Sequence, residues 1–144
     1  CINFYKIASR TVTDKKLCKK IIKIGKPVFI SLGFYNYKKY KIPFKGDNIS
    51  YFYCVSKYPT NLQDIDMPDF EKDKIFSGYS DHTIGIHACQ YAVSRGAQYI
   101  EKHFSNNKSI GVDTQMAHVC SMDQNELSQL RSYSDSITLI KSNK

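Results

Sequence analysis

Five short runs of apolar residues recur along the 144-residue chain, and each has the length and composition of a β-strand. They are rich in Ile, Val, Phe and Tyr, and several are almost continuously apolar, as in parallel strands that are covered on both faces. Their starts are spaced by about 24 residues, which suits one strand–helix unit. The predicted strands cover residues 2–8, 27–32, 51–55, 76–79 and 98–104.

Amphipathic segments between these runs predict helices. Asp14 can cap a first helix that ends at Gly25, a second helix is closed by Gly96, and Asp123 can cap a third. The segment 35–48 contains proline and glycine and is short for a full helix, so we expect an irregular or one-turn connection there.

Alternating strands and helices predict an α/β fold with right-handed crossovers. Five strands fit a flavodoxin-like doubly wound sheet, and they fit equally well five of the eight units of a (β/α)₈ barrel. Periodicity leaves both architectures open. No glycine-rich phosphate loop follows any predicted strand, since 31–33 is too short for one, and this weakens a nucleotide-binding interpretation.

The net charge of +8 raises the question of an anionic partner, but its composition argues against nucleic acid. Of the 21 basic residues only three are Arg, the residue best suited to bidentate recognition of phosphates and bases. The lysines are spread along the chain, which is typical of a solvated surface. No apolar run approaches the ~20 residues of a membrane helix. We therefore expect a cytoplasmic protein without nucleic-acid or membrane partners.

Five cysteines occur in the chain, and no two of them form a C-x-x-C pair. An odd number without that spacing argues against a disulfide scaffold and against a zinc knuckle. We expect all five to be reduced and structural.

Two histidines stand at the carboxyl ends of consecutive predicted strands, His82 and His103. Neighbouring parallel strands lie ~4.8 Å apart, so two imidazoles at matching heights can reach one metal ion. With only two protein ligands, such a site would stay open to water and substrate. Ordinary strand-end histidines that make hydrogen bonds are the competing interpretation. His87 and His118 are given no role.

Other polar residues gather at the same strand ends, where ligands bind in either architecture. Lys6 lies inside a predicted strand, so it either reaches solvent or meets an anion such as a phosphate. Ser9, Ser56 and Ser80 can donate to the same anion. Glu101 shares a face with His103 and can act as a general base, or it can pair with a nearby lysine.

Taken in order, several strings in the chain resemble the sialic acid synthase (N-acetylneuraminate synthase) family. They are Tyr-Lys-Ile-Ala-Ser at 5–9, Gly-Lys-Pro-Val at 25–28, Cys-Val-Ser-Lys-Tyr-Pro-Thr at 54–60, Gly-Tyr-Ser-Asp-His-Thr-Ile-Gly at 78–85, Gly-Ala-Gln-Tyr-Ile-Glu-Lys-His-Phe at 96–104, and residues 123–130. The Ser-Asp-His-Thr and Glu-Lys-His-Phe pair is the most specific part. The resemblance covers nearly the whole chain.

The resemblance implies a partial (β/α)₈ TIM barrel holding strands four to eight. Residues 1–144 would then be a fragment of the catalytic domain, without its first three strands and without the C-terminal antifreeze-like domain. The implied activity is a transferase reaction that condenses phosphoenolpyruvate with an N-acyl amino sugar of the N-acetylmannosamine type, giving a sialic acid and phosphate with C–O cleavage. The parent enzyme is expected to be a homodimer, and the isolated chain to be inactive.

The same resemblance implies a role for each polar strand end. His82 and His103 would hold Mn²⁺ or Mg²⁺, Glu101 would be a catalytic acid or base, and Lys6 would bind phosphoenolpyruvate and stabilise charge during catalysis.

The remaining residues that the resemblance assigns are substrate contacts. Ser9, Ser56 and Ser80 look like phosphoenolpyruvate ligands, and Tyr58 and Asp113 look like sugar contacts.

One departure from the family pattern falls at the pocket rim. The family usually has Ser-Thr-Gly where this chain has Ser31-Leu32-Gly33, and we expect the change at Leu32 to remove a hydroxyl from the rim.

Alternative functions remain open at this stage. A related synthase making legionaminic or pseudaminic acid would use the same chemistry. A non-catalytic remnant would bind metal or anion without turnover. A basic nucleic-acid module would show salt-dependent DNA binding that survives loss of both histidines.

Overall fold

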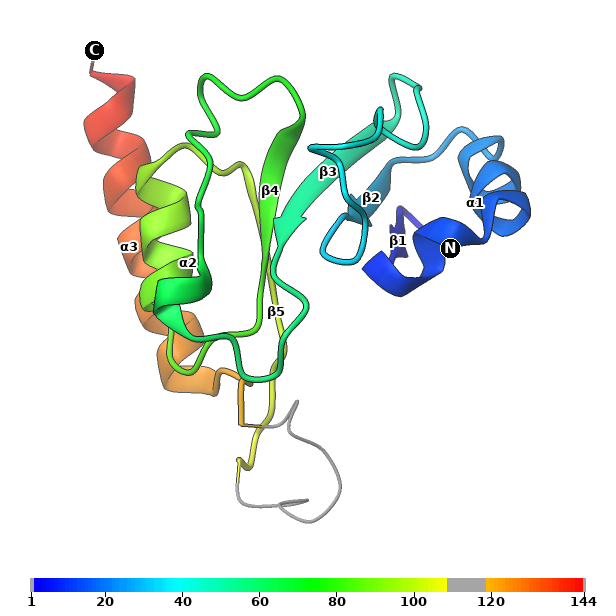
Figure 1. Cartoon of the computed structure of the whole chain (residues 1–144). Helices are drawn as coiled ribbons and strands as arrows, with labels where there is room; N and C mark the ends of the chain where they lie inside the picture. The colour runs from blue at the N-terminus through cyan, green and yellow to red at the C-terminus, as the bar shows by residue number, and fades with distance from the viewer. Residues whose placement is uncertain (1, 109–118, 144) are drawn as a thin grey trace.

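A parallel β-sheet forms the centre of the molecule, with its strands in the order in which they follow along the chain (Figure 1). The computed structural model describes residues 2–108 and 119–143. The strands are β1 (Tyr5–Ile7), β2 (Val28–Ser31), β3 (Ile49–Cys54), β4 (Phe76–Asp81) and β5 (Tyr99–Lys102). Neighbouring strands all pair in parallel. The five predicted strands are confirmed, with bounds that differ by a few residues.

The strand order decides between the two architectures that the sequence pattern left open. A doubly wound sheet reverses its order at a switch point, whereas a barrel adds each strand beside the last. The order here is β1-β2-β3-β4-β5 without a reversal. In a flat sheet β1 and β5 would lie about 19 Å apart. Instead Lys6 Nζ on β1 lies 3.1 Å from Glu101 Oε2 on β5, so the sheet curls into a half-barrel.

Both of the predicted capping residues lie at the start of a helix. Asp14 accepts a hydrogen bond from the Leu17 amide at the start of α1 (Lys15–Ile22). Asp123 and Glu126 form a capping box at the start of α3 (Gln124–Ser142). The second helix, α2 (His87–Ser94), has no side-chain cap. Short 3₁₀ helices follow β1 and β3, η1 (Ser9–Thr13) and η2 (Leu62–Asp64).

The connection from β2 to β3 contains no helix or strand, as expected for segment 35–48. It is held to the sheet by Tyr51, whose hydroxyl accepts from the Phe44 amide at 3.1 Å and donates to the Phe44 carbonyl at 2.7 Å. Burial raises the pKa of Tyr51 to about 12, so this hydroxyl stays protonated as a donor. One aromatic side chain therefore satisfies a backbone donor and a backbone acceptor in an otherwise irregular segment.

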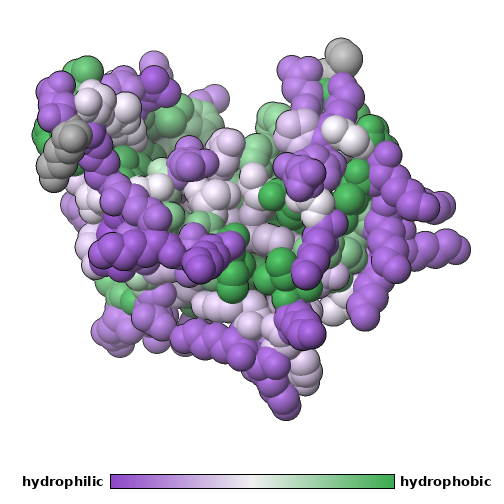
Figure 2. Space-filling model, turned by 90° about the horizontal axis from the view of Figure 1, so that it is seen from above, coloured by the Kyte–Doolittle hydropathy of each residue, from purple (hydrophilic) through white to green (hydrophobic). Residues whose placement is uncertain are grey.

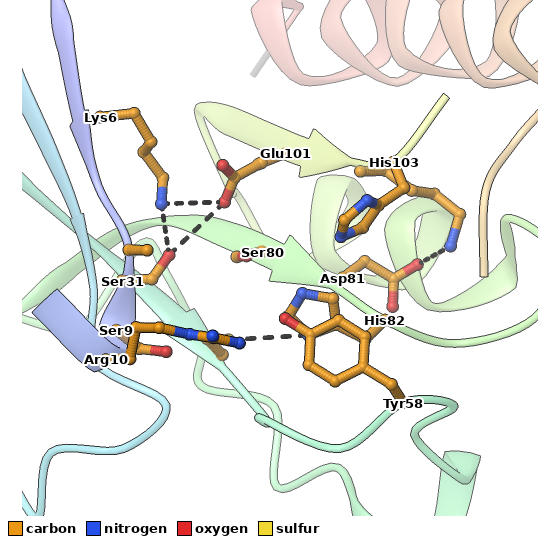
Figure 3. A pocket seen from close by; sticks show the side chains of 13 residues that line it. Lys6, Ser9, Arg10, Ser31, Tyr58, Ser80, Asp81, His82, Glu101 and His103 are labelled. Atoms are coloured by element: carbon orange, nitrogen blue, oxygen red, sulfur yellow. Dashed lines mark hydrogen bonds and ion pairs between the residues drawn. The ribbon is translucent and has the colours of Figure 1, made fainter. Parts of the chain in front are cut away.

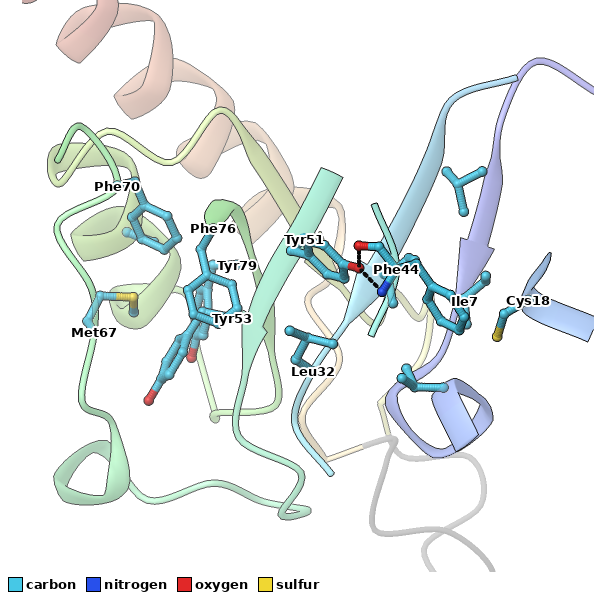
Figure 4. Packing of buried hydrophobic residues seen from close by; sticks show 14 of the residues in the cluster. Ile7, Cys18, Leu32, Phe44, Tyr51, Tyr53, Met67, Phe70, Phe76 and Tyr79 are labelled. Atoms are coloured by element: carbon cyan, nitrogen blue, oxygen red, sulfur yellow. Dashed lines mark hydrogen bonds between the residues drawn. The ribbon is translucent and has the colours of Figure 1, made fainter. Parts of the chain in front are cut away.

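The hydrophobic core lies on the convex face of the sheet, between the strands and the connecting segments (Figure 4). Because side chains alternate along a strand, every second residue points into this core. The core includes Ile7, Ile30, Leu32, Tyr53 and Tyr79, each no more than 5% exposed. Hydrophilic side chains project around the rim of the molecule, with hydrophobic patches between them (Figure 2).

The concave face carries a cluster of aromatic rings near the amino ends of the strands. Phe29 lies 5.4 Å from Phe4, 5.4 Å from Phe52 and 4.9 Å from Tyr99, measured between ring centroids. We call Phe4, Phe29, Phe52 and Tyr99 the aromatic floor. A Cβ at Gly78 would lie 2.7 Å from the Phe52 ring, so only glycine lets the ring pack against β4. The floor closes the concave face below the polar strand ends.

The four described cysteines, Cys18, Cys54, Cys89 and Cys120, are buried free thiols. The prediction of reduced, structural cysteines is confirmed for them, while Cys1 lies outside the described residues. None of the described helices is both long and apolar enough to span a membrane.

Candidate functional site

A pocket of about 390 Å³ opens at the carboxyl ends of the strands (Figure 3). Alternation along each strand explains its composition, since every second residue faces the concave side. The lining residues come from all five strands and the segments that follow them: Lys6, Ala8, Ser9, Arg10, Ser31, Cys54, Tyr58, Ser80, Asp81, His82, Glu101, Lys102 and His103. Seven of the nine residues that the sequence assigned to a site lie here.

A hydrogen-bonded triad of Lys6, Ser31 and Glu101 lies on one side of the pocket. Lys6 Nζ donates to Ser31 Oγ at 2.9 Å and pairs with Glu101 Oε2 at 3.1 Å. Ser31 Oγ donates to the same carboxylate oxygen at 3.5 Å. Lys6 therefore meets a carboxylate in the pocket, and an anionic ligand would compete with Glu101 for its ammonium group. The pairing of Glu101 with Lys6 was one of the two arrangements expected for this glutamate.

Two serines from different segments form a second polar contact. Ser9 Oγ, at the start of η1, lies 3.0 Å from Ser56 Oγ, which follows β3. Ser56 does not itself line the pocket, but it holds Ser9, which does. A Cβ at Gly33 would lie 2.2 Å from Ser56 Oγ, so a residue with a side chain at position 33 would displace this serine. Ser80, only 4% exposed, faces the pocket from β4.

The expected loss of a rim hydroxyl at Leu32 is wrong. Leu32 is 2% exposed and belongs to the hydrophobic core on the convex face. Its neighbour Ser31 faces the pocket, and alternation sends position 32 the other way. The change at position 32 therefore alters core packing and leaves the hydroxyls of the pocket as they are.

His82 and His103 face one another at the mouth of the pocket, with ring centroids 5.6 Å apart. A metal–nitrogen bond of about 2.1 Å places two imidazoles on one ion with centroids roughly 4.5–6.5 Å apart, so the spacing of the two rings is compatible with a shared metal. Among the described residues, no third His, Cys, Asp or Glu joins them as a ligand group. Water and substrate would complete the coordination of an ion held here.

The surroundings of His82 prepare its ring for such a role. Nδ1 lies 3.0 Å from the Val55 carbonyl, which can only accept, so Nδ1 carries the proton and Nε2 is the free acceptor. Burial lowers the pKa of His82 below its ordinary value of 6.5, which keeps the ring neutral near pH 7. The Tyr58 ring packs against His82 with centroids 4.1 Å apart and lies 6.0 Å from His103.

A buried ion pair lies directly beside the two histidines. Lys102 Nζ is 2.6 Å from Asp81 Oδ2, and both side chains are fully buried. Asp81 also accepts from the Thr83 amide, the Thr83 hydroxyl, the Tyr79 hydroxyl and the Cys89 thiol. Lys102 in turn donates to the Thr83 carbonyl at 2.7 Å. The pair ties the end of β4 to the end of β5, one residue before each histidine.

Sequence reasoning missed three features of the site. Asp81 was given no role, although a buried strand end beside a lysine in the next strand is a signal for pairing. Ser31 was mentioned only because it precedes Leu32, and Arg10 was given no role. Alternation from Lys6 and Phe29 would have placed Ser31 on the concave face.

Asp113, the second predicted sugar contact, lies outside the described residues, as does His118.

Comparison with known proteins places these residues in a family context. The model described as the NeuB family matches residues 1–144. The N,N'-diacetyllegionaminic acid synthase of Campylobacter jejuni is 34% identical over 142 residues, which cover 90% of this chain and 41% of that protein. The pseudaminic acid synthase of the same species is 35% identical over 116 residues, covering 74% of this chain and 34% of that protein. The chain thus spans about two fifths of the length of these relatives or less.

A more distant relative and a solved structure agree with this family. The human N-acetylneuraminate-9-phosphate synthase is 29% identical over 140 residues, which cover 90% of this chain and 38% of that protein. The crystal structure of the N-acetylneuraminic acid synthetase of Leptospira borgpetersenii, in complex with citrate, superposes with a TM-score of 0.79 at 27% identity. That superposition covers 96% of this chain and 51% of the solved chain.

Proposed function

The chain belongs to the NeuB family, and on that premise we propose that its pocket serves the condensation of phosphoenolpyruvate with an N-acyl amino sugar, giving a sialic acid or a related nonulosonic acid and phosphate. One observation carries the proposal. The half-barrel brings an anion-binding group, a carboxylate and a facing pair of histidines into one pocket, represented by Lys6, Glu101, His82 and His103. These are the group types that the reaction needs.

The phosphoenolpyruvate subsite is proposed around Lys6. Its ammonium group and the hydroxyls of Ser9, Ser31 and Ser80 can present hydrogen-bond donors to a ligand in the pocket. Charge-assisted hydrogen bonds to a phosphate are about twice as strong as neutral ones. When the phosphate binds, Lys6 can transfer its ion pair from Glu101 to the ligand. These donors would also stabilise the phosphate as it departs with its bridging oxygen.

Glu101 is the proposed acid or base. Release of its partner Lys6 to the substrate would leave its carboxylate free, and 40% of the Glu101 side chain is already exposed. A carboxylate in this position can take a proton from the water that adds to the enol-derived carbon, or return one to the sugar oxygen after carbon–carbon bond formation.

His82 and His103 are the proposed ligands of a divalent metal, Mn²⁺ or Mg²⁺. When bound, the ion would polarise the aldehyde of the open-chain sugar as a Lewis acid. The residues of this chain contribute the ligand geometry. The Val55 carbonyl fixes the tautomer of His82, and Tyr58 covers the ring face of His82 and can contact the sugar.

Calorimetric titration of Mn²⁺ tests the proposal directly. We expect the chain to bind Mn²⁺, to lose binding in the His82→Ala/His103→Ala variant, and to bind more tightly when phosphoenolpyruvate is present. The matched control is His87→Ala, a change at an exposed histidine on α2. If a folded chain binds Mn²⁺ equally well without His82 and His103, the metal site is wrong. DNA binding that the His82→Ala/His103→Ala variant retains would instead favour a nucleic-acid module.

A further inference from the structure

The positively charged side chains that line the pocket outnumber the negatively charged ones by one. Four of them form two ion pairs, Lys6 with Glu101 at 3.1 Å and Lys102 with Asp81 at 2.6 Å. The fifth is Arg10, which has no ion-pair partner among residues 2–108 and 119–143. The pocket therefore carries one uncompensated positive charge, and Arg10 supplies it.

The backbone that carries Arg10 is held firmly at the pocket mouth. Arg10 is the second residue of η1, where its neighbour Ser9 contacts Ser56 at 3.0 Å. Two residues further on, Val12 is 2% exposed and anchors η1 in the core. The Thr11 amide donates to the Ala8 carbonyl at 2.9 Å, which closes the turn. An arginine on such a fixed turn loses less freedom on binding a ligand than one on a loose loop.

The side chain of Arg10 extends across the pocket mouth toward Tyr58 and His82 (Figure 3). Burial raises the pKa of Tyr58, and the positive charge of Arg10 acts in the opposite direction, which is a sign of its proximity. Lys6 lies on the other side of the pocket, beside Glu101. The pocket thus presents two cationic groups on separate sides, one paired in the absence of ligand and the other unpaired.

We propose that Arg10 is a substrate-binding residue that grips a second oxyanion of the ligand, separate from the one that Lys6 and the serines bind. The inference rests on the proposed function, in which phosphoenolpyruvate brings both a phosphate and a carboxylate. A guanidinium group matches either oxyanion with two parallel hydrogen bonds, which a lysine cannot reproduce. With Lys6 on one group and Arg10 on the other, the carbon that bears both groups is held in place. The methylene carbon that attacks the sugar then points in a defined direction.

Titration of phosphoenolpyruvate into the wild-type chain, Arg10→Ala and Arg10→Lys tests this role, with Mn²⁺ present. Arg10→Ala is expected to raise the dissociation constant about tenfold, since hydrogen bonds to charged groups contribute at that level. Arg10→Lys keeps the charge without the planar fork and should fall between the two. The control is Arg131→Ala, because Arg131 lies on α3 outside the pocket and pairs with Asp135. Affinity for Mn²⁺ alone should stay unchanged in all four proteins.

Two further ligands identify the group that Arg10 holds. Inorganic phosphate and pyruvate are titrated separately into the wild type and Arg10→Ala, and the ligand whose affinity falls carries the oxyanion in question. Wild-type binding of phosphoenolpyruvate with no loss in Arg10→Ala overturns this inference and leaves the proposed function standing. Absence of phosphoenolpyruvate binding by the folded wild type overturns both.

Discussion

Lys6 on the first strand and Glu101 on the fifth meet across the concave face at 3.1 Å. Their side chains remain 24% and 40% exposed, so water screens the pair and its contribution to folding is small. In the proposed function, a phosphate that enters the pocket would compete with Glu101 for the Lys6 ammonium group.

This relationship predicts opposite effects for its two members. Lys6→Ala should weaken phosphoenolpyruvate binding at least tenfold while lowering the free energy of unfolding by about 1 kcal/mol or less. Glu101→Gln should leave binding intact or tighter, because Lys6 is then released, yet abolish turnover in the active enzyme. Calorimetry and urea denaturation measure the two quantities. Lys38→Ala, which breaks an exposed pair with Asp66, controls for loss of a positive charge. Equal loss of affinity in Lys38→Ala would contradict the assignment.

The two histidines should differ in their effect on folding and agree in their effect on metal binding. His82 is 7% exposed and hydrogen-bonded to Val55, so His82→Ala should cost about 1–3 kcal/mol of stability. His103 is exposed, and its replacement by alanine should cost well under 1 kcal/mol. Each change should remove Mn²⁺ binding. Retention of Mn²⁺ binding by either single variant, once folded, would show that the two rings do not share an ion.

The buried pair of Asp81 and Lys102 predicts a large and non-additive effect on stability. Removal of one partner leaves an uncompensated buried charge, and Asp81→Asn or Lys102→Met alone should cost about 3–5 kcal/mol. The double variant should be more stable than the sum of the two losses implies. Urea unfolding of the four proteins completes the cycle. Simple additivity would mean that the two groups do not interact in solution.

Protonation of Asp81 at low pH should lower the stability of the folded chain. Burial alone would raise the pKa of Asp81, but Lys102 and the hydrogen bonds from Thr83 and Tyr79 together bring it below its ordinary value of 3.8. Below pH 3.8 the unfolded chain takes up this proton before the folded chain does. The stabilisation is therefore complete above pH 3.8 and is lost as the pH falls through the lower, folded value. Unfolding measured between pH 5 and pH 2 should show this loss in the wild type and lack it in Asp81→Asn.

Leu32→Thr tests the face on which position 32 lies. Because Leu32 belongs to the convex core, a threonine there leaves a cavity and a buried hydroxyl, at a cost of about 2–4 kcal/mol. Affinity for phosphoenolpyruvate should not improve. A gain in affinity with unchanged stability would place the side chain in the pocket after all. Leu62→Thr, at an exposed position on η2, is the matched control.

Local sequence features predicted the elements well because each is set by nearby residues. Asp14 and Asp123 cap their helices through amides three residues ahead, and strand runs follow from apolar composition. Curvature could not be predicted in this way, since it depends on contacts between residues far apart. The meeting of Lys6 with Glu101 joins positions 95 residues apart. Strand order was equally inaccessible to periodicity, and the resemblance was needed to choose the barrel.

Within the site, the sequence indicated which residue types matter but not which side chains contact one another. Strand-end histidines and a lysine inside a strand are unusual enough to be noticed. The ion pair of Asp81 and Lys102 was not predicted, because each residue stands next to a histidine that drew attention first and because the pair joins two different strands. Arg10 escaped because an arginine after a strand is ordinary until its neighbours show that it faces a pocket.

The aromatic floor makes one side of the concave face apolar, while the strand ends make the other side polar. The ammonium group of Lys6 lies 5.8 Å from the centre of the Phe52 ring, so this cation lies over an aromatic π-face. A wall of low polarity on one side weakens dielectric screening there, and the charges above it act more strongly on a ligand than they would on an open surface. On the other side, the carboxyl ends of the strands carry the polar lining of the pocket, including Arg10 and the two histidines.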